Sequence, residues 1–333
     1  MNSKERVIRT ITFDHPDRIP INTWTMPSAI NKYGKPLVDA IEKYSIDFGG
    51  PYYISHVVDD NKRLEPGTYK DGWGCVWTNF KSGIIGEVKE SPLADYSNLK
   101  TYKSPKELLK LGMERVDSSL AEAKDKFLFA PWGVDLFERM QYLRGTENLY
   151  IDIMEESDEF LLMKDIVFDF YLEFMKIWLE RDIDGFIFAD DWGGQNSLLV
   201  PPRVFRKIFK PMYKILIDMA KQKGKYVFFH SDGNITEIYD DFVELGVDAI
   251  NSQLWCMDIN EISRKYRGKI SFWGEISRQT TLPFGTSEDV RNDANTMKRL
   301  LMHNGGGLIG TAAPGDECPL ENILESLKCW NKA

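Results

Sequence analysis

Short apolar runs alternate with amphipathic segments along the second half of the chain. Apolar runs of strand length occur near residues 185–190, 226–230, 247–251, 270–274 and 307–311. Helical periodicity fills the intervals, near 202–222, 235–245, 258–266, 286–302 and 319–331, and a longer helical pattern from Glu159 to about Arg181 precedes them. Strands that alternate with helices in this way predict parallel βαβ units.

The first half of the chain is less regular. Helices are predicted over 6–13 and 105–123, and strands over 17–24, 46–49 and 127–133. The aromatic, glycine-containing stretch 73–88 predicts a β-hairpin outside the main sheet. The early and late strands together number about eight, which is the number that closes a (β/α)8 TIM barrel.

A doubly wound open sheet is the alternative α/β fold. It is less favoured because no glycine-rich phosphate-binding turn follows the first strand. The chain shows no internal repeat and no low-complexity linker. We therefore predict that residues 1–333 form a single α/β domain, a (β/α)8 TIM barrel with an N-terminal helical and β-hairpin excursion.

Composition and charge narrow the function classes. Hydrophobic residues make up 43% and charged residues 28% of the 333 residues, which indicates a packed core. The net charge of −9 argues against nucleic acid as a partner. No apolar run approaches the length of a membrane span, and the charged start of the chain is unlike a signal peptide. We expect a cytoplasmic protein that acts on a small molecule.

Polar side chains follow three of the predicted strands. The apolar run 226–229 ends in His230, with Asp232 two positions later. Both residue types are zinc ligands, and two such groups at one strand end can share a metal in a barrel. The same pair also suits acid–base chemistry. The alternative is that 232–234 is only a turn with a helix cap.

The strand at 185–190 ends in two adjacent carboxylates, Asp190 and Asp191. Such groups after a buried strand are costly unless they are paired or used. Because successive side chains diverge, we expect one of the two to face the pocket. We predict Asp191 as a catalytic residue alongside His230. Substrate-binding roles are predicted for Asp190, Trp192 and Gln195, and also for Trp24 after the first strand. The alternative for the two aspartates is a helix cap.

Two further residues are candidate metal ligands. Glu275 follows the strand at 270–274 and would join His230 and Asp232. Its alternative is a surface glutamate. Cys318 lies in the loop before the last helix, where a thiolate ligand or a small buried thiol would fit, and Cys256 is a similar outside candidate. The cysteines lack CxxC spacing, so we expect free thiols rather than disulfides.

Several of these segments together resemble the uroporphyrinogen decarboxylase superfamily. The resemblance rests on the opening 6–8 and 17–20, the turns Asp190-Asp191-Trp192-Gly193 and His230-Ser231-Asp232-Gly233, and the ending 319–323. It covers nearly the whole chain, and the order and spacing of the motifs carry it. The resemblance implies a (β/α)8 barrel whose site lies at the C-terminal face of the strands.

The resemblance implies one of two chemistries. True decarboxylases of the family remove carboxylates from a porphyrinogen without a cofactor, whereas corrinoid-linked methyltransferases use zinc. Thiol-methylating members would have His-x-Cys and a later Cys as ligands. Here His230 matches the first ligand, Asp232 stands in place of the first Cys, and Thr311 or Ala312 falls near the second. This departure argues against a thiol acceptor and favours an oxygen-richer, harder metal site.

The decarboxylase-type arginine segment after the first strand is also missing, because residues 23–28 read TWTMPS. A substrate with many carboxylates needs nearby cations. The leading hypothesis is therefore a metal-dependent methyltransferase. It would use zinc or another divalent metal to move a methyl group from a small O- or N-methyl donor to a corrinoid protein. A cofactor-free carboxy-lyase of porphyrin biosynthesis and a non-catalytic binding member of the family are the alternatives.

Overall fold

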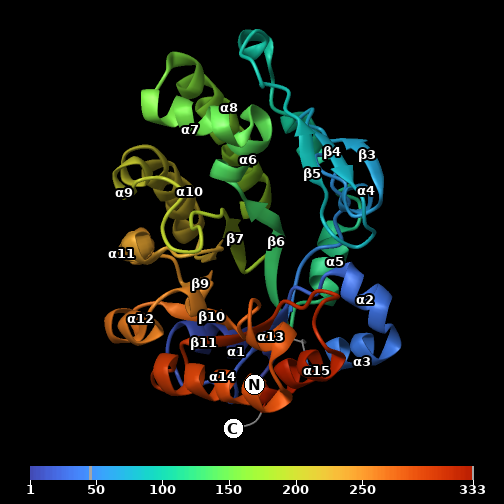
Figure 1. Ribbon diagram of the computed structural model, residues 1–333, viewed down its shortest axis with the longest axis vertical. Coiled ribbons are helices and arrows are strands. Elements are labelled where there is room, and N and C mark those ends of the chain that lie inside the picture. Colours follow the sequence, from blue (N-terminus) through green and yellow to red (C-terminus); the bar gives the residue numbers. More distant parts are fainter. Residues whose placement is uncertain (45–46, 332–333) are drawn as a thin grey trace.

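The computed structural model describes residues 1–44 and 47–331. Its main feature is an eight-stranded parallel sheet wound into a nearly closed (β/α)8 barrel, as predicted (Figure 1). Neighbouring strands follow the order β1-β11-β10-β9-β8-β7-β6-β2. Their bounds are β1 Ile21–Thr23, β2 Phe48–Gly49, β6 Phe127–Val134, β7 Gly185–Ala189, β8 Tyr226–Ser231, β9 Ala249–Ser252, β10 Ser271–Glu275 and β11 Leu308–Ala312.

Helices surround the barrel, and those of the second half of the chain lie in the predicted intervals. The main helices are α1 Ser3–Ile11, α2 Pro27–Tyr33, α3 Lys35–Tyr44, α5 Val116–Glu122, α6 Leu136–Arg144, α7 Thr146–Glu155, α8 Asp158–Leu179, α10 Lys210–Gln222, α11 Tyr239–Leu245, α12 Ile259–Tyr266, α14 Ser287–Leu301 and α15 Leu320–Lys328. Of these, α2, α3, α6 and α7 were not predicted. Shorter turns are α4 Asp60–Arg63, α9 Pro202–Val204 and α13 Thr281–Phe284. Within the described chain, no helix has the length and apolarity needed to cross a bilayer.

The carboxylate of Asp47 joins the two edge strands of the barrel. It accepts a hydrogen bond from the backbone N–H of Ile21 at 2.9 Å and pairs with Arg6 and Arg18 at 2.8 and 2.7 Å. Arg6 also binds Asp17. The basic and acidic residues at the start of the chain therefore hold the N-terminal end of the barrel together. The predicted strand at 46–49 is two residues long, and Ile46 lies outside the described residues.

Aromatic side chains fill the barrel interior. Phe127, Phe129, Phe228 and Trp273 form one buried cluster with α1 residues such as Val7. Phe129 and Phe228 lie edge to face at 4.9 Å. A larger apolar cluster fills the space between the strands and the outer helices. The packed interior leaves the C-terminal strand ends as the place for chemistry.

The N-terminal excursion differs in detail from the prediction. The predicted hairpin over 73–88 is present as β4 Val76–Asn79 and β5 Glu87–Glu90, and a third antiparallel strand, β3 Gly67–Lys70, pairs with β4. The single helix predicted over 105–123 is wrong, because it is a 3-10 turn at Lys106–Lys110 followed by α5. Gly112 separates the two. Its φ of +71° brings it against the carbonyl of Ile54, where a helix could not continue. This excursion rises beside α6 and α8 (Figure 1).

Candidate metal site at the strand ends

Three side chains from the ends of β7 and β8 converge at the C-terminal face of the barrel. Asp191 follows β7, His230 is the penultimate residue of β8, and Asp232 follows β8. The Nε2 atom of His230 lies 3.5 Å from Oδ1 of Asp191 and 3.7 Å from Oδ1 of Asp232. One ligand atom from each residue lies within 4.8 Å of the others. We call these residues the metal triad.

Asn251 of β9 sets the orientation of His230. Its amide nitrogen donates to the carbonyl of Trp273, so its Oδ1 is left to accept, and this oxygen lies 2.6 Å from Nδ1 of His230. Nδ1 must therefore carry a proton and donate it, which makes Nε2 the ring nitrogen that faces the two aspartates and would bind a metal. In metal-binding histidines, the ring nitrogen that does not bind the metal typically donates a hydrogen bond to a nearby oxygen in this way.

The donor set fits a divalent cation. A tetrahedral zinc site with bonds of about 2.0–2.2 Å holds its ligand atoms roughly 3.3 Å apart, close to the separations between Nε2 and the carboxylates. One imidazole and two carboxylates suit zinc or a somewhat harder metal. The side chains are 17%, 36% and 33% exposed for His230, Asp191 and Asp232. The triad is therefore accessible from the barrel mouth.

The two adjacent aspartates have different surroundings. Asp191 faces the triad, and its Oδ1 accepts the backbone N–H of Asp232 at 2.7 Å. Burial raises the pKa of its carboxyl group. The neighbouring Asp190 is fully buried and accepts the backbone N–H groups of Phe137 and Glu138 at the start of α6. Asp190 is therefore not the substrate-binding residue that the sequence predicted. It caps α6, which precedes β7 in the chain, and not the helix that follows β7.

Glu275 lies near the triad but is not part of it. Its Oε1 pairs with Nε of Arg278 at 2.6 Å, and the same guanidinium also binds Asp232. The Oε2 atom is buried without a hydrogen-bond partner, and burial raises the pKa of Glu275 to about 7. The sequence reasoning overlooked Arg278, although its position three residues after Glu275 was a usable signal.

The predicted aromatic and amide residues separate into two groups. Trp24 lies beside the triad, edge to face with the His230 ring at 5.0 Å and with Trp273 at 4.5 Å. Trp192 is instead fully buried and stacked on Phe137 at 4.3 Å, so it does not line the mouth in this structure. Gln195 is exposed and accepts a hydrogen bond from Gln279 at the rim.

No disulfide joins the cysteines within the described part of the chain. Cys318 is buried, its Sγ lies 3.5 Å from Oε1 of Glu317, and burial raises its pKa to about 11. Cys256 donates to the carbonyl of Gln253 at 3.0 Å, and burial also raises its pKa. Neither thiol belongs to the group of ligand atoms that the described residues bring together. Raised pKa values favour the protonated thiol, which is a poor metal ligand.

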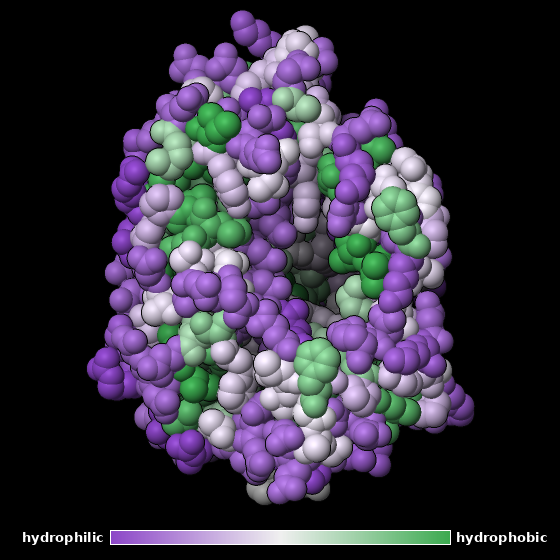
Figure 2. Space-filling view, in the orientation of Figure 1, coloured by the Kyte–Doolittle hydropathy of each residue, from purple (hydrophilic) through white to green (hydrophobic). Residues whose placement is uncertain are grey.

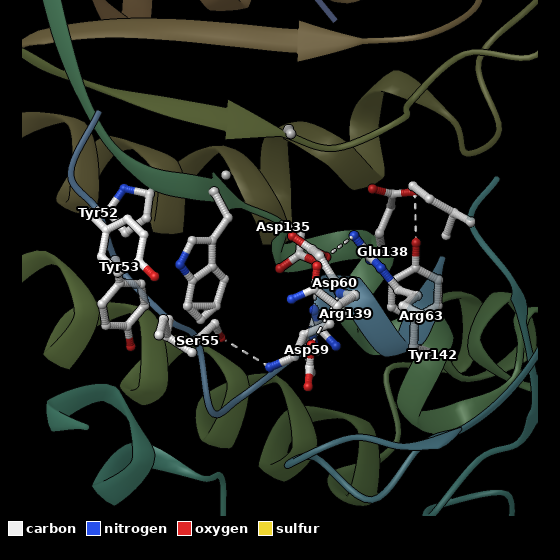
Figure 3. A pocket seen from close by; sticks show the side chains of 18 residues that line it. Tyr52, Tyr53, Ser55, Asp59, Asp60, Arg63, Asp135, Glu138, Arg139 and Tyr142 are labelled. Carbon is white, nitrogen blue, oxygen red and sulfur yellow. Dashed lines mark hydrogen bonds and ion pairs between the residues drawn. The ribbon is translucent and has the colours of Figure 1, made fainter. Parts of the chain in front are cut away.

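A cavity of about 670 Å³ adjoins the site on the side of β6. It lies between the excursion, the start of α6 and the end of β7, where Ala189 lines it two positions before Asp191. Figure 3 shows Tyr52 and Tyr53 on one side of the cavity and Asp135, Glu138 and Arg139 on the other. In Figure 2 the same face of the molecule is hollowed near its centre. The sequence reasoning did not identify this cavity, since segments far apart in the chain form it.

Glu138 carries an unusual charge state in this cavity. Burial and the charges of Asp191, Asp190 and Asp135 raise its pKa to about 9. Its Oε1 accepts from the hydroxyl of Tyr142 at 3.3 Å. At neutral pH the carboxyl group is therefore mostly protonated, so an uncharged acid lies close to the triad.

Comparisons with known proteins agree with the fold. A methyltransferase from Methanosarcina mazei has a similar structure, with a TM-score of 0.69 and 13% sequence identity over 99% of this chain and 98% of that one. Identity this low shows a shared fold alone. No curated protein sequence matches the chain. The sequence model of the family described as Uroporphyrinogen decarboxylase (URO-D) matches residues 78–330, well over half of the chain. The chain therefore belongs to the uroporphyrinogen decarboxylase family.

Proposed function

We propose that this protein is a metal-dependent methyltransferase that moves a methyl group from a small methylated donor to a corrinoid protein. The observation that carries the proposal is the metal triad, in which Nε2 of His230 faces two carboxylates. The name of the structural neighbour, a methyltransferase, supports the same reaction class. We also propose that the methyl donor is a small O- or N-methyl compound and that the acceptor is a corrinoid carried by a partner protein.

His230, Asp191 and Asp232 would hold the metal. When bound there, a divalent ion such as zinc acts as a Lewis acid and makes the methyl group on the donor heteroatom more electrophilic. The chain's own residues prepare the site. Asn251 fixes the His230 ring, and the indole of Trp24 packs edge to face against that ring.

Asp191 has a second role in this proposal. Its Oδ1 already accepts the N–H of Asp232, so Oδ2 remains to orient the donor or to hold a proton. Once the methyl group leaves, the donor heteroatom keeps the bonding electron pair and takes up a proton. Water at the solvent-accessible triad supplies that proton in this proposal.

The decarboxylase alternative has weaker support at the triad. A polycarboxylate substrate requires free cations. The guanidinium nearest the triad in the described chain, Arg278, is already held by Glu275 and Asp232. No arginine occurs in residues 23–28 after the first strand. We therefore expect that uroporphyrinogen is not decarboxylated at an ordinary enzymatic rate, roughly 1–1000 per second.

The direct test is a methyl-transfer assay. Metal-loaded protein is incubated with a panel of O-, N- and S-methyl donors and with free cobalamin reduced to Co(I) as acceptor. The proposal predicts donor demethylation and methylation of cobalamin for one donor class, and loss of both in a His230→Ala variant. Conversion of uroporphyrinogen with no methyl transfer from any donor would favour the decarboxylase.

A further inference from the structure

The cavity beside the triad has one aromatic and one acidic wall. Tyr53 and Trp132 stack with a centroid distance of 6.1 Å and an angle of 16°. Phe174 supports Trp132 from the side at 5.7 Å. The aromatic wall is thus built from mutually packed rings, which resist rearrangement.

The backbone at Trp132 is strained in a way that fixes this wall. Trp132 has a φ of +47°, within a β6 segment whose register shifts between Phe129 and Gly133. A Cβ on Gly133 would lie 2.7 Å from Cβ of Ala189, so only glycine fits there. Left-handed conformations of bulky residues persist where the surroundings impose them, and they cluster at ligand sites.

The charged wall has more carboxyl than guanidinium groups. Asp59, Asp60, Asp135 and Glu138 face the cavity together with Arg63 and Arg139. Arg63 pairs with Asp60 at 2.7 Å, and Arg139 pairs with Asp135 at 2.9 Å.

The charge of each arginine is therefore balanced by an aspartate, although Nε of Arg63 and Nε and Nη1 of Arg139 have no hydrogen-bond partner among the described residues. The face of Arg139 also lies over the rings of Trp73 and Tyr142. Asp59 accepts N–H groups at the start of α4, which leaves Glu138 without a cation among the described residues. Without a cation beside it, the Glu138 carboxyl group is mostly protonated at neutral pH. A ligand cation would offset the repulsion from the neighbouring aspartates, lower the pKa of Glu138 and favour the carboxylate that pairs with the ammonium.

We propose that this cavity binds a small organic cation, an ammonium group of the donor, between the Tyr53–Trp132 wall and the Glu138 carboxyl group. Aromatic faces combined with carboxylates are the usual recognition chemistry for alkylated ammonium. This inference rests on the proposed function. The ammonium is the anchoring end of the donor and not the atom that gives up its methyl group, because a quaternary nitrogen has no lone pair to offer a metal.

Choline and its uncharged carbon isostere 3,3-dimethyl-1-butanol are the test probes, and acetate tests the opposite charge. Binding is measured by calorimetry on the full-length protein, without turnover. We expect saturable choline binding at one site and binding of the isostere that is roughly 2- to 30-fold weaker. Equal binding of the two, preference for acetate, or no saturable binding would overturn the cation site.

Matched variants locate the binding. Glu138→Gln should weaken choline binding about tenfold, and Trp132→Leu should weaken choline more than the isostere. Glu147→Gln, which removes an exposed carboxylate on α7, should leave binding unchanged. Tyr53→Leu replaces Trp132→Leu if the latter fails to fold. Unchanged choline binding in both Glu138→Gln and the aromatic variant would refute the assignment.

The outcome is separable from that of the proposed function. Choline binding in a protein that transfers no methyl group would uphold the cation site and refute the methyltransferase. Methyl transfer together with equal binding of choline and its isostere would uphold the methyltransferase and refute the cation site.

Discussion

The ends of β7 and β8 and the end of β10 have the same sequence pattern but different chemistry. Each is an apolar strand that finishes in a carboxylate. At the first, Asp191, His230 and Asp232 face one another, and Arg278 pairs with Asp232 at the edge of the group. At the second, the same Arg278 pairs with the buried Glu275. The arginine therefore holds Glu275 away from the triad and competes with a metal for Asp232.

The largest expected effect separates Asp191 from Asp190. Asp191→Asn should lower turnover roughly 100-fold or more, because the charge and the proton-accepting group are lost, with little change in melting temperature. Asp190→Asn should instead destabilise the protein by about 1–3 kcal/mol, because its new N–H groups would face the N–H donors at the start of α6. Turnover and melting temperature are measured for both variants. Near-normal activity in Asp191→Asn would make it a structural residue.

The second prediction concerns the residue that orients His230. Asn251→Leu removes the acceptor at Nδ1, so metal affinity should fall 10- to 100-fold. Asn251→Asp keeps that acceptor and should retain more of the affinity. Metal titration with a competing chelator measures both. Equal affinity of the two variants would show that the Nδ1 contact has no part in metal binding.

The third prediction tests whether Arg278 competes with a metal for Asp232. Arg278→Met frees Asp232 and removes a positive charge beside the triad, so metal affinity should rise by about tenfold. Arg264→Met, an exposed change on α12, is the control. Weaker metal binding in Arg278→Met would mean that the arginine supports the triad instead of competing with the metal.

The smallest effect is a pH dependence at the end of β10. Glu275 has its pKa raised from 4.5 to about 7, so between these values the folded state binds more protons than the unfolded state. Its contribution to stability is therefore present below about pH 4.5 and is lost as pH rises toward 7. From pH 6 to pH 7 the loss should be about 1 kcal/mol in the wild type.

The Glu275→Gln variant should not show this loss of stability between pH 6 and pH 7. Melting temperatures of metal-free wild type and variant, compared at pH 6 and pH 7, measure the difference. Parallel changes in the two proteins would show that Glu275 does not titrate in this range.

The sequence pattern predicted the barrel because strand and helix periods are local properties. It also predicted His230 and Asp232 as neighbours, since they lie two positions apart at one strand end. Asp191 could be expected nearby because β7 and β8 are consecutive parallel strands. The predicted role of Asp190 depended on which of two adjacent side chains faces the mouth, and local pattern does not decide that.

The remaining site features arise from contacts between distant segments. Asn251 lies in the next strand and contacts His230 across the sheet. The pairing of Arg278 with Glu275 is local, but its contact with Asp232 joins segments far apart in the chain. The cavity unites the excursion with β6 and α6, whose packing depends on the whole fold. Trp132 lies within the predicted strand 127–133, and the strand pattern does not reveal its left-handed backbone.

The central claim is that the triad holds a metal, and elemental analysis of the purified protein tests it most directly. The wild type and the exposed-residue control His56→Ala should each contain close to one zinc or similar divalent ion per chain, and the double variant His230→Ala, Asp232→Ala should contain almost none. Stoichiometric metal in that folded double variant, or a wild type that transfers methyl groups without any metal, would contradict the account.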